Sequence, residues 1–134
     1  MLAPKKQKHR KHFQIKPKGT STRGTKIDFG SFAMKSIESG WVSSRQIEAS
    51  RRVITRYLQR GGKMWIRIFP DLVLTKKGGE IPMGKGKGAP DQYVAVVNKG
   101  RIIFELEGVT EDMAKKAIEL AIYKMPIKCK FIKK

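Results

Sequence analysis

Apolar and polar residues alternate over several short segments of the chain, with a period of two that is typical of β-strands with one buried face. The expected strands, in chain order, cover residues 29–37, 64–69, 93–97, 101–107 and 127–133. In the fourth of them, Ile102, Phe104 and Leu106 fall on one face. The run Asn98-Lys99-Gly100 predicts a hairpin turn between the third and fourth strands, because Gly100 can adopt a positive φ.

Two further segments repeat their apolar residues with the period of an α-helix. The first covers 44–60, and Ser43 with Gln46 three residues later fits a capping box at its start. The second is capped by Thr110 and ends at Pro126. Strands and helices mix without regular βαβ units, so the expected fold class is α+β, with a mixed, mostly antiparallel sheet packed with two helices.

Residues 1–26 lack this periodicity and contain nine Lys and Arg residues but no acidic residue. Such a segment cannot bury enough apolar surface to offset its ordering entropy alone. We interpret it as a basic, extended N-terminal arm that orders on a partner, with a solubilising tail or a targeting peptide as the alternatives. Residues 27–134 then form a single α+β domain with a mobile Gly/Lys-rich loop over 76–91.

The composition narrows the class of protein. The 134 residues carry 30 Lys and Arg against 11 Asp and Glu, a formal net charge of +19 that implies a polyanionic partner, either nucleic acid or an anionic membrane surface. No apolar run approaches the ~20 residues of a membrane span. The single cysteine, Cys129, excludes an internal disulfide framework.

The sequence shows no catalytic arrangement. Residues 79–85 match the first seven positions of a phosphate-binding loop, but Gly86 follows where that motif needs Ser or Thr. His9 and His12 lie among cations, which oppose a metal ion. We therefore expect no enzyme, no cofactor and no metal site.

Three basic elements remain as candidates for contact with nucleic-acid phosphates: the arm, one face of the first helix, and the loop over 83–88. Arg45, Arg52 and Arg56 fall together, opposite the apolar stripe of the helix. The alternative is a merely solvated face, but Glu48 is the one acid on that helix that could pair with them. For the loop, the alternative is a mobile connection without a partner.

The strand over 64–69 adds aromatic residues to this picture. Trp65 and Phe69, beside Arg67, could stack on unpaired bases, although a buried second face of the sheet is the favoured explanation. No base-reading motif is visible in the sequence, which suggests recognition of folded RNA by shape and phosphate.

Several runs of residues occur in a distinctive order. They are Met1-Leu2 with Pro4-Lys5, Arg10-Lys11, Phe29-Gly30-Ser31-Phe32, 45–49 with Arg51-Arg52, Gly62-Lys63, 65–71, Met83-Gly84-Lys85-Gly86-Lys87-Gly88, Gly100-Arg101 and 124–128. Together they cover nearly the whole chain and resemble the large-subunit ribosomal protein L-sixteen family, in its bacterial or organellar form.

The resemblance implies a structural constituent of the large ribosomal subunit. Such a protein binds large-subunit ribosomal RNA and helps to shape and stabilise the aminoacyl-tRNA site near the peptidyl-transferase centre. The implied partners are that RNA, the tRNA of the aminoacyl site and neighbouring ribosomal proteins, with no membrane and no homo-oligomer. The implied location is the bacterial cytoplasm or the interior of an organelle that encodes the protein, since the family pattern begins at Met1. The alternative is a non-ribosomal basic nucleic-acid-binding protein.

On this resemblance, the arm and the first helix bind ribosomal RNA, and the Gly/Lys-rich loop approaches the tRNA. The candidate rRNA-binding residues are Lys5, Lys6, Lys8, Arg10, Lys11, Lys16, Lys18, Arg23, Arg45, Arg51, Arg52, Arg56 and Arg60. The candidate tRNA-site loop consists of Met83, Gly84, Lys85, Gly86, Lys87 and Gly88. Pro82 departs from the family, because many bacterial members carry Arg there, and any contact or modification of that arginine is lost.

Overall fold

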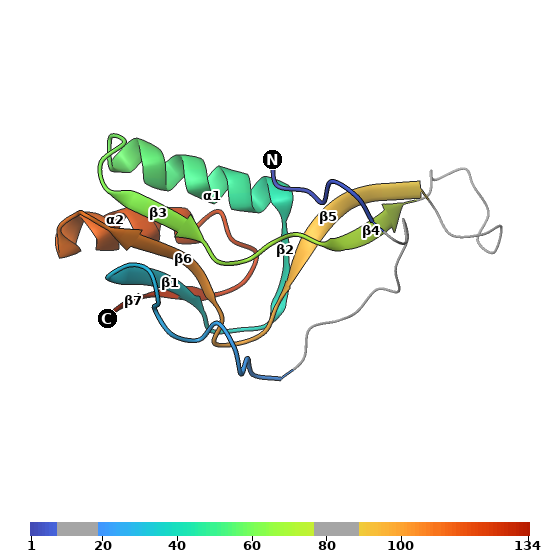
Figure 1. Cartoon of the computed structure of the whole chain (residues 1–134), viewed down its shortest axis with the longest axis horizontal. Helices are drawn as coiled ribbons and strands as arrows, with labels where there is room; N and C mark the ends of the chain where they lie inside the picture. Colours follow the sequence, from blue (N-terminus) through green and yellow to red (C-terminus); the bar gives the residue numbers. More distant parts are fainter. Residues whose placement is uncertain (8–18, 77–88) are drawn as a thin grey trace.

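The computed structural model describes residues 1–7, 19–76 and 89–134 (Figure 1). This part of the chain has the expected α+β fold, with two helices and two antiparallel sheets. In chain order the elements are β1 (Phe32–Ser36), β2 (Gly40–Ser43), α1 (Ser44–Tyr57), β3 (Lys63–Ile66), β4 (Leu72–Lys76), β5 (Ala89–Val97), β6 (Ile102–Glu107), α2 (Glu111–Ile122) and β7 (Cys129–Lys133).

The larger sheet has four strands in the order β3-β6-β1-β7. α2 packs on β1 and β7, and α1 lies beside α2 (Figure 1). The core between helices and sheet is apolar, and the small residues of α2 allow close approach to the strands. Its fully buried members include Met34, Ile47, Ile54, Phe104, Leu106, Ala114, Ala117 and Ile118. Burial of this apolar surface is the main term that stabilises the domain.

A second, three-stranded antiparallel sheet has the order β2-β5-β4. The predicted hairpin is therefore wrong, because β5 pairs with β2 and β4 whereas β6 pairs with β1 and β3. The turn at 98–100 instead carries the chain from one sheet into the other. Ser36 of β1 holds this crossing: its N–H donates to Arg101 O (2.9 Å) and its hydroxyl donates to Asn98 O (3.0 Å).

Several predicted boundaries also shift. The sequence pattern misses β2 and β4, whose residues, Gly-Trp-Val-Ser and Leu-Val-Leu-Thr-Lys, do not alternate between apolar and polar. The loop predicted over 76–91 is shorter, because β4 reaches Lys76 and β5 begins at Ala89. The remainder of that loop lies outside the described residues. The strand predicted over 64–69 ends at Ile66.

α1 begins as predicted and ends earlier than predicted. Ser43 Oγ accepts a hydrogen bond from Gln46 N–H (3.2 Å), and Gln46 Oε1 accepts one from Ser43 N–H (2.9 Å), which completes the capping box. The helix ends at Tyr57 because Gln59 and Arg60 adopt left-handed φ values of 52° and 63°. Each left-handed non-glycine residue costs on the order of 1 kcal/mol, so the surroundings must hold this turn in place.

The end of the predicted arm is packed on the domain. Ser21 N–H donates to Lys99 O (2.8 Å), and Ile102 N–H donates to Gly24 O (2.7 Å). Gly24 has a φ of 65°, and a Cβ at this position would lie 2.8 Å from Arg101 Nε, so the backbone approaches the domain closely here. The division between arm and domain at residue 26 stays a prediction.

Candidate nucleic-acid interface

α1 turns its apolar stripe inward and its arginines outward. Ile47 and Ile54 are buried in the core, whereas Arg45, Arg52 and Arg56 are exposed. This separation follows from the helical period and confirms the two stripes expected from the sequence. The helix therefore presents a row of guanidinium groups to whatever lies on its outer side.

Glu48 pairs with two of the arginines on this helix. Arg51 Nε donates to Glu48 Oε2 (3.0 Å), and Arg52 Nε donates to Glu48 Oε1 (3.2 Å). The hydrogen bond from Arg51 lowers the pKa of Glu48 to about 2, so this carboxylate stays ionised over all ordinary conditions. Glu48 therefore pairs with Arg52 of the arginine face, as expected, and with Arg51 as well.

Three further candidate arginines lie on α1 or just after it and are not neutralised in this way. Among the described residues, no ion pair is formed by Arg45, Arg56 or Arg60. Their guanidinium groups are free to meet an external anion. Guanidinium groups suit phosphate because their planar donors can bond two phosphate oxygens at once.

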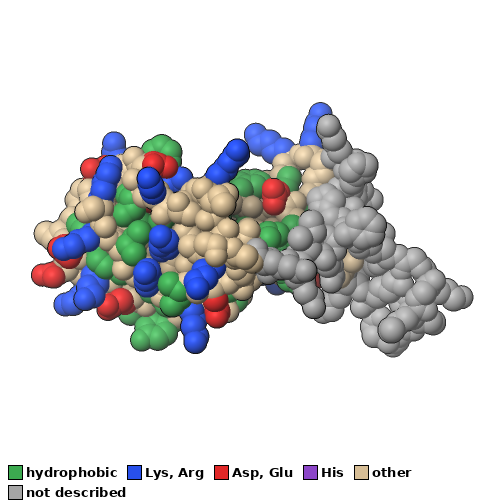
Figure 2. Space-filling model, turned by 90° about the horizontal axis from the view of Figure 1, so that it is seen from below, with side chains coloured by type: hydrophobic (Ala, Val, Ile, Leu, Met, Phe, Trp, Pro, Cys, Tyr) green, Lys and Arg blue, Asp and Glu red, His purple; other side chains and the backbone are tan. Residues whose placement is uncertain are grey.

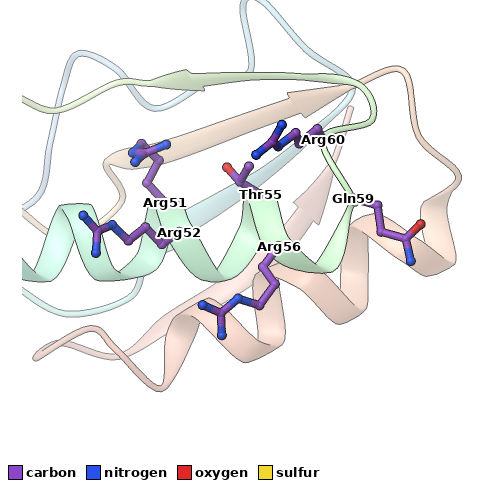
Figure 3. A pocket seen from close by; sticks show the side chains of 6 residues that line it. All are labelled: Arg51, Arg52, Thr55, Arg56, Gln59 and Arg60. Carbon is purple, nitrogen blue, oxygen red and sulfur yellow. The ribbon is translucent and has the colours of Figure 1, made fainter.

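Four of the arginines, Arg51, Arg52, Arg56 and Arg60, gather around a shallow hollow of about 440 Å³ at the C-terminal half of α1 (Figure 3). Arg60 N–H donates to Thr55 O (3.2 Å), and in Figure 3 the Arg60 side chain lies next to Thr55, on the side where Arg51 also lies. The left-handed turn after the helix thus brings a fourth guanidinium toward the helix face. The hollow is lined by Arg51, Arg52, Thr55, Arg56, Gln59 and Arg60.

The remaining candidate residues divide into two groups. Lys5, Lys6 and Arg23 are exposed and described by the structure. The others lie outside the described residues, namely Lys8, Arg10, Lys11, Lys16, Lys18 and the whole candidate tRNA-site loop over 83–88. The structure therefore brings together Arg51, Arg52, Arg56 and Arg60. The rRNA contact of the arm and the tRNA contact of the loop stay predictions.

The side of the molecule away from α1 has a different character. Figure 2, seen from below Figure 1, shows Lys and Arg side chains scattered among Asp, Glu and hydrophobic ones over the described part of this face. On β7 and α2, away from the arginines of α1, Lys133 Nζ lies 3.3 Å from Glu111 Oε1. Mixed charge of this kind gives a weaker net field than the α1 face, where acidic partners are few.

Trp65, one of the two aromatic residues considered for stacking on bases, packs within the protein. The ring of Trp65 stacks on Phe29 with centroids 5.9 Å apart, and the Arg67 guanidinium lies 5.1 Å from the Phe29 centroid. Phe69 is about half exposed. Trp65 is therefore accounted for by packing against Phe29 on the outer face of the larger sheet.

Glu105 is a charged residue that the structure buries. Its side chain is fully buried in β6 and forms an ion pair with Arg67, which also lies 3.1 Å from Asp28. Its Oε1 accepts hydrogen bonds from Phe29 N–H (2.8 Å) and Gly30 N–H (2.9 Å). Burial raises the pKa of Glu105, but these donors and the guanidinium outweigh it, so the pKa is lowered overall.

Groups for catalysis are few. Burial raises the pKa of the Cys129 thiol to about 12, so it stays protonated and is a poor nucleophile. Within the described ranges, no group of three or more His, Cys, Asp or Glu residues could hold a metal ion. No helix in this part of the chain is both long and apolar enough to cross a membrane.

A small, strongly basic α+β domain with a cationic helix face is typical of proteins that bind a polyanion. The family is given by comparison with known proteins: the sequence profile of the ribosomal protein L16p/L10e family matches residues 4–132. The chain belongs to this family. Its members are structural proteins rather than enzymes, so the expectation of no enzymatic activity is confirmed.

Individual relatives are similar over nearly their whole length. The chain is 55% identical to the large ribosomal subunit protein uL16c of Psilotum nudum over 132 residues, which cover 98% of this chain and 94% of the relative. It is 53% identical to uL16c of Cyanidium caldarium, with 98% and 94% covered. It is 54% identical to uL16 of Dehalococcoides mccartyi, with 98% and 89% covered. Chloroplast and bacterial relatives confirm the expected location on a ribosome of the bacterial cytoplasm or of an organelle.

Proposed function

We propose that this chain, as a structural constituent of the large ribosomal subunit, binds large-subunit ribosomal RNA through the arginine face of α1. The observation that carries the proposal is the exposure of Arg45 and Arg56 on α1 and of Arg60 just after it, for which no acidic partner is found in the described part of the chain. The names of the relatives, which are proteins of the large ribosomal subunit, support the choice of RNA.

The chemistry of this contact is electrostatic. Each guanidinium that meets a phosphate displaces condensed counterions from the RNA, so the affinity falls with rising salt. Glu48 holds Arg51 and Arg52 in fixed positions and cancels part of their charge. Arg52 keeps 72% of its side chain exposed and can still reach a phosphate beside the three unpaired arginines.

The basic arm is the second part of the proposal. Its root is held on the domain by the hydrogen bond from Ile102 N–H to Gly24 O (2.7 Å). Arg23 next to this contact is exposed, as are Lys5 and Lys6 near the start of the chain. These cations support a contact between the arm and the same RNA, with the candidate residues between 8 and 18 included as a prediction.

The third part of the proposal concerns the aminoacyl-tRNA site. We infer from the family resemblance that the loop over 83–88 approaches the tRNA there and that Lys85 and Lys87 supply the charge. The fold supports this placement. The end of β4 and the start of β5, which flank the loop, lie side by side at the end of the molecule opposite α2 (Figure 1).

The rRNA contact is tested by the salt dependence of binding to purified large-subunit ribosomal RNA. The triple variant R45Q/R56Q/R60Q should bind more weakly and lower the slope of log affinity against log salt by about two to three. The matched control is K115Q/K116Q/K128Q, which removes the same charge from exposed lysines elsewhere in the domain. An equal loss for both triple variants would mean that only net charge matters, and that the α1 face is not the binding site.

The tRNA contact is tested in ribosomes that carry K85A/K87A. These variants should enter the large subunit normally and bind tRNA at the aminoacyl site more weakly than the parent chain does. Normal tRNA affinity in such ribosomes would refute this part of the proposal while leaving the rRNA contact standing.

A further inference from the structure

A second hollow lies beside the arginine cluster, between α1 and the end of α2. Its volume is about 620 Å³, within the range of small-molecule sites. Its walls are mainly apolar and aromatic, since Tyr57 comes from α1 and Leu120 and Tyr123 come from α2 and the residue that follows it. The full lining is Val53, Arg56, Tyr57, Gln59, Leu120, Tyr123 and Lys124.

The aromatic and aliphatic side chains of this groove are unusually exposed. Tyr123 keeps 85% and Leu120 keeps 44% of the residue surface accessible. An exposed tyrosine beside an exposed leucine does not contribute to the core of the domain. Exposed apolar surface rimmed by polar groups is typical of an interaction site.

The groove also carries positive charge and lies next to the arginine face. Arg56 and Gln59 line both hollows, and Lys124 completes the rim of the groove. No acidic residue is among the seven that line it. An apolar protein segment placed here would desolvate Arg56 and Lys124 without supplying an opposite charge, which is costly. A partner that carries both a flat, weakly polar ring and an anionic group fits the apolar walls and the cations of this groove better.

We propose that this groove holds one unstacked nucleotide of the large-subunit ribosomal RNA. The base lies against the Tyr123 ring, its phosphate lies near Arg56 and Lys124, and the Gln59 amide is available to its polar edge. Stacking of unpaired bases on tyrosine, with phosphates held by cations, is a common mode of RNA recognition. The inference rests on the proposed rRNA contact of α1 and adds a base-stacking element to what is otherwise a phosphate-binding surface.

The test measures binding of the full chain to large-subunit ribosomal RNA. The RNA is transcribed from the same genome that encodes the chain. Y123A should weaken binding about tenfold without changing the salt slope, because a stacked base is lost and no phosphate contact is. Y123F keeps the ring and should bind like the parent chain, whereas Y123L keeps apolar volume and should behave like Y123A. M113A is the matched control, because Met113 is an exposed apolar residue of α2 outside the groove.

Ultraviolet crosslinking followed by mass spectrometry gives an independent readout. A nucleotide adduct on Tyr123 in the complex, together with the affinity losses above, would establish the groove as a base site. Thermal unfolding of each variant checks the fold, which an 85% exposed side chain should not affect.

The possible failures are distinguishable. If R45Q/R56Q/R60Q weakens binding but Y123A does not, and no nucleotide adduct forms, the base site is wrong and the phosphate-binding surface stands. If Tyr123 crosslinks to another protein in assembled subunits, the groove is a protein-docking site instead. If the affinity of the parent chain for the RNA does not depend on salt, the proposed phosphate contact of the arginine face is refuted, whatever the result for Tyr123.

Discussion

The ion pair of Glu105 with Arg67 offers a sharp test of how the domain is held together. We consider the variant Glu105→Gln, which keeps the shape of the side chain and an oxygen that can accept from Phe29 and Gly30. It removes the negative charge from a site that is fully buried. The amide nitrogen that replaces one carboxylate oxygen then faces the Arg67 guanidinium, so a donor meets a donor.

The size of the effect follows from the contacts. Two hydrogen bonds from backbone N–H groups, at 2.8 and 2.9 Å, change from charge-assisted to neutral, which costs about 1 kcal/mol each. Breaking a buried ion pair costs about 3–5 kcal/mol, but Arg67 keeps Asp28 at 3.1 Å and 15% exposure, which reduces that figure. The expected loss is about 2–4 kcal/mol, a large fraction of the ~5–15 kcal/mol typical of a domain.

The measurement is urea unfolding followed by circular dichroism at neutral and at acid pH. Because the pKa of Glu105 is lower in the folded chain than its ordinary value of 4.5, its contribution is complete above that value. The contribution is lost as the pH falls through the lowered pKa. The parent chain should therefore lose stability from about pH 5 downward, and Glu105→Gln should lose less over the same range.

Glu107→Gln is the matched control, because Glu107 follows on the same strand and is exposed. It makes the same change in net charge and should cost less than about 0.5 kcal/mol. If the two variants are equally stable and share the parent chain's dependence on pH, the buried network does not stabilise the fold and the reasoning above is refuted.

Three further predictions concern single residues. Ser43→Ala removes the capping box with Gln46 and should lower stability by about 1 kcal/mol in thermal or urea unfolding, whereas no loss would show that the cap is not needed. Gly30→Ala places a Cβ 2.5 Å from Leu106 O, so β6 or the preceding segment must shift; we expect a loss of about 1–3 kcal/mol in urea unfolding, and an unchanged midpoint would contradict the tight contact. Cys129, with its pKa raised to about 12, should react with iodoacetamide at neutral pH far more slowly than a free thiol peptide, and equal rates would show that its burial is not maintained.

Features that depend on neighbouring residues could be predicted from the sequence. The capping box at Ser43, the inward stripe of Ile47 and Ile54 and the outward stripe of arginines all follow from the helical period within one segment. The prediction of the first helix failed only at its end, where Gln59 and Arg60 adopt positive φ although the glycines follow them. The backbone propensities of Gln and Arg do not predict a left-handed conformation, since this turn is held by the residues around it.

Features that depend on distant residues could not be predicted. The turn at 98–100 looks like a hairpin locally, but Ser36, about sixty residues earlier, bonds to both sides of it and draws β6 toward β1. The burial of Glu105 has the same origin, because the segment at 28–30 covers it. The apolar groove also escapes sequence reading, because Tyr57 and Tyr123 meet only when α1 and α2 pack together.

The docking of residues 21–24 has a consequence for the cohesion of the two sheets. Ser21 N–H donates to Lys99 O and Ile102 N–H donates to Gly24 O, on either side of the turn where the chain passes from one sheet into the other. These two hydrogen bonds therefore tie a segment early in the chain to the same crossing that Ser36 holds. Gly24, which lets the chain lie close against Arg101, makes this contact possible.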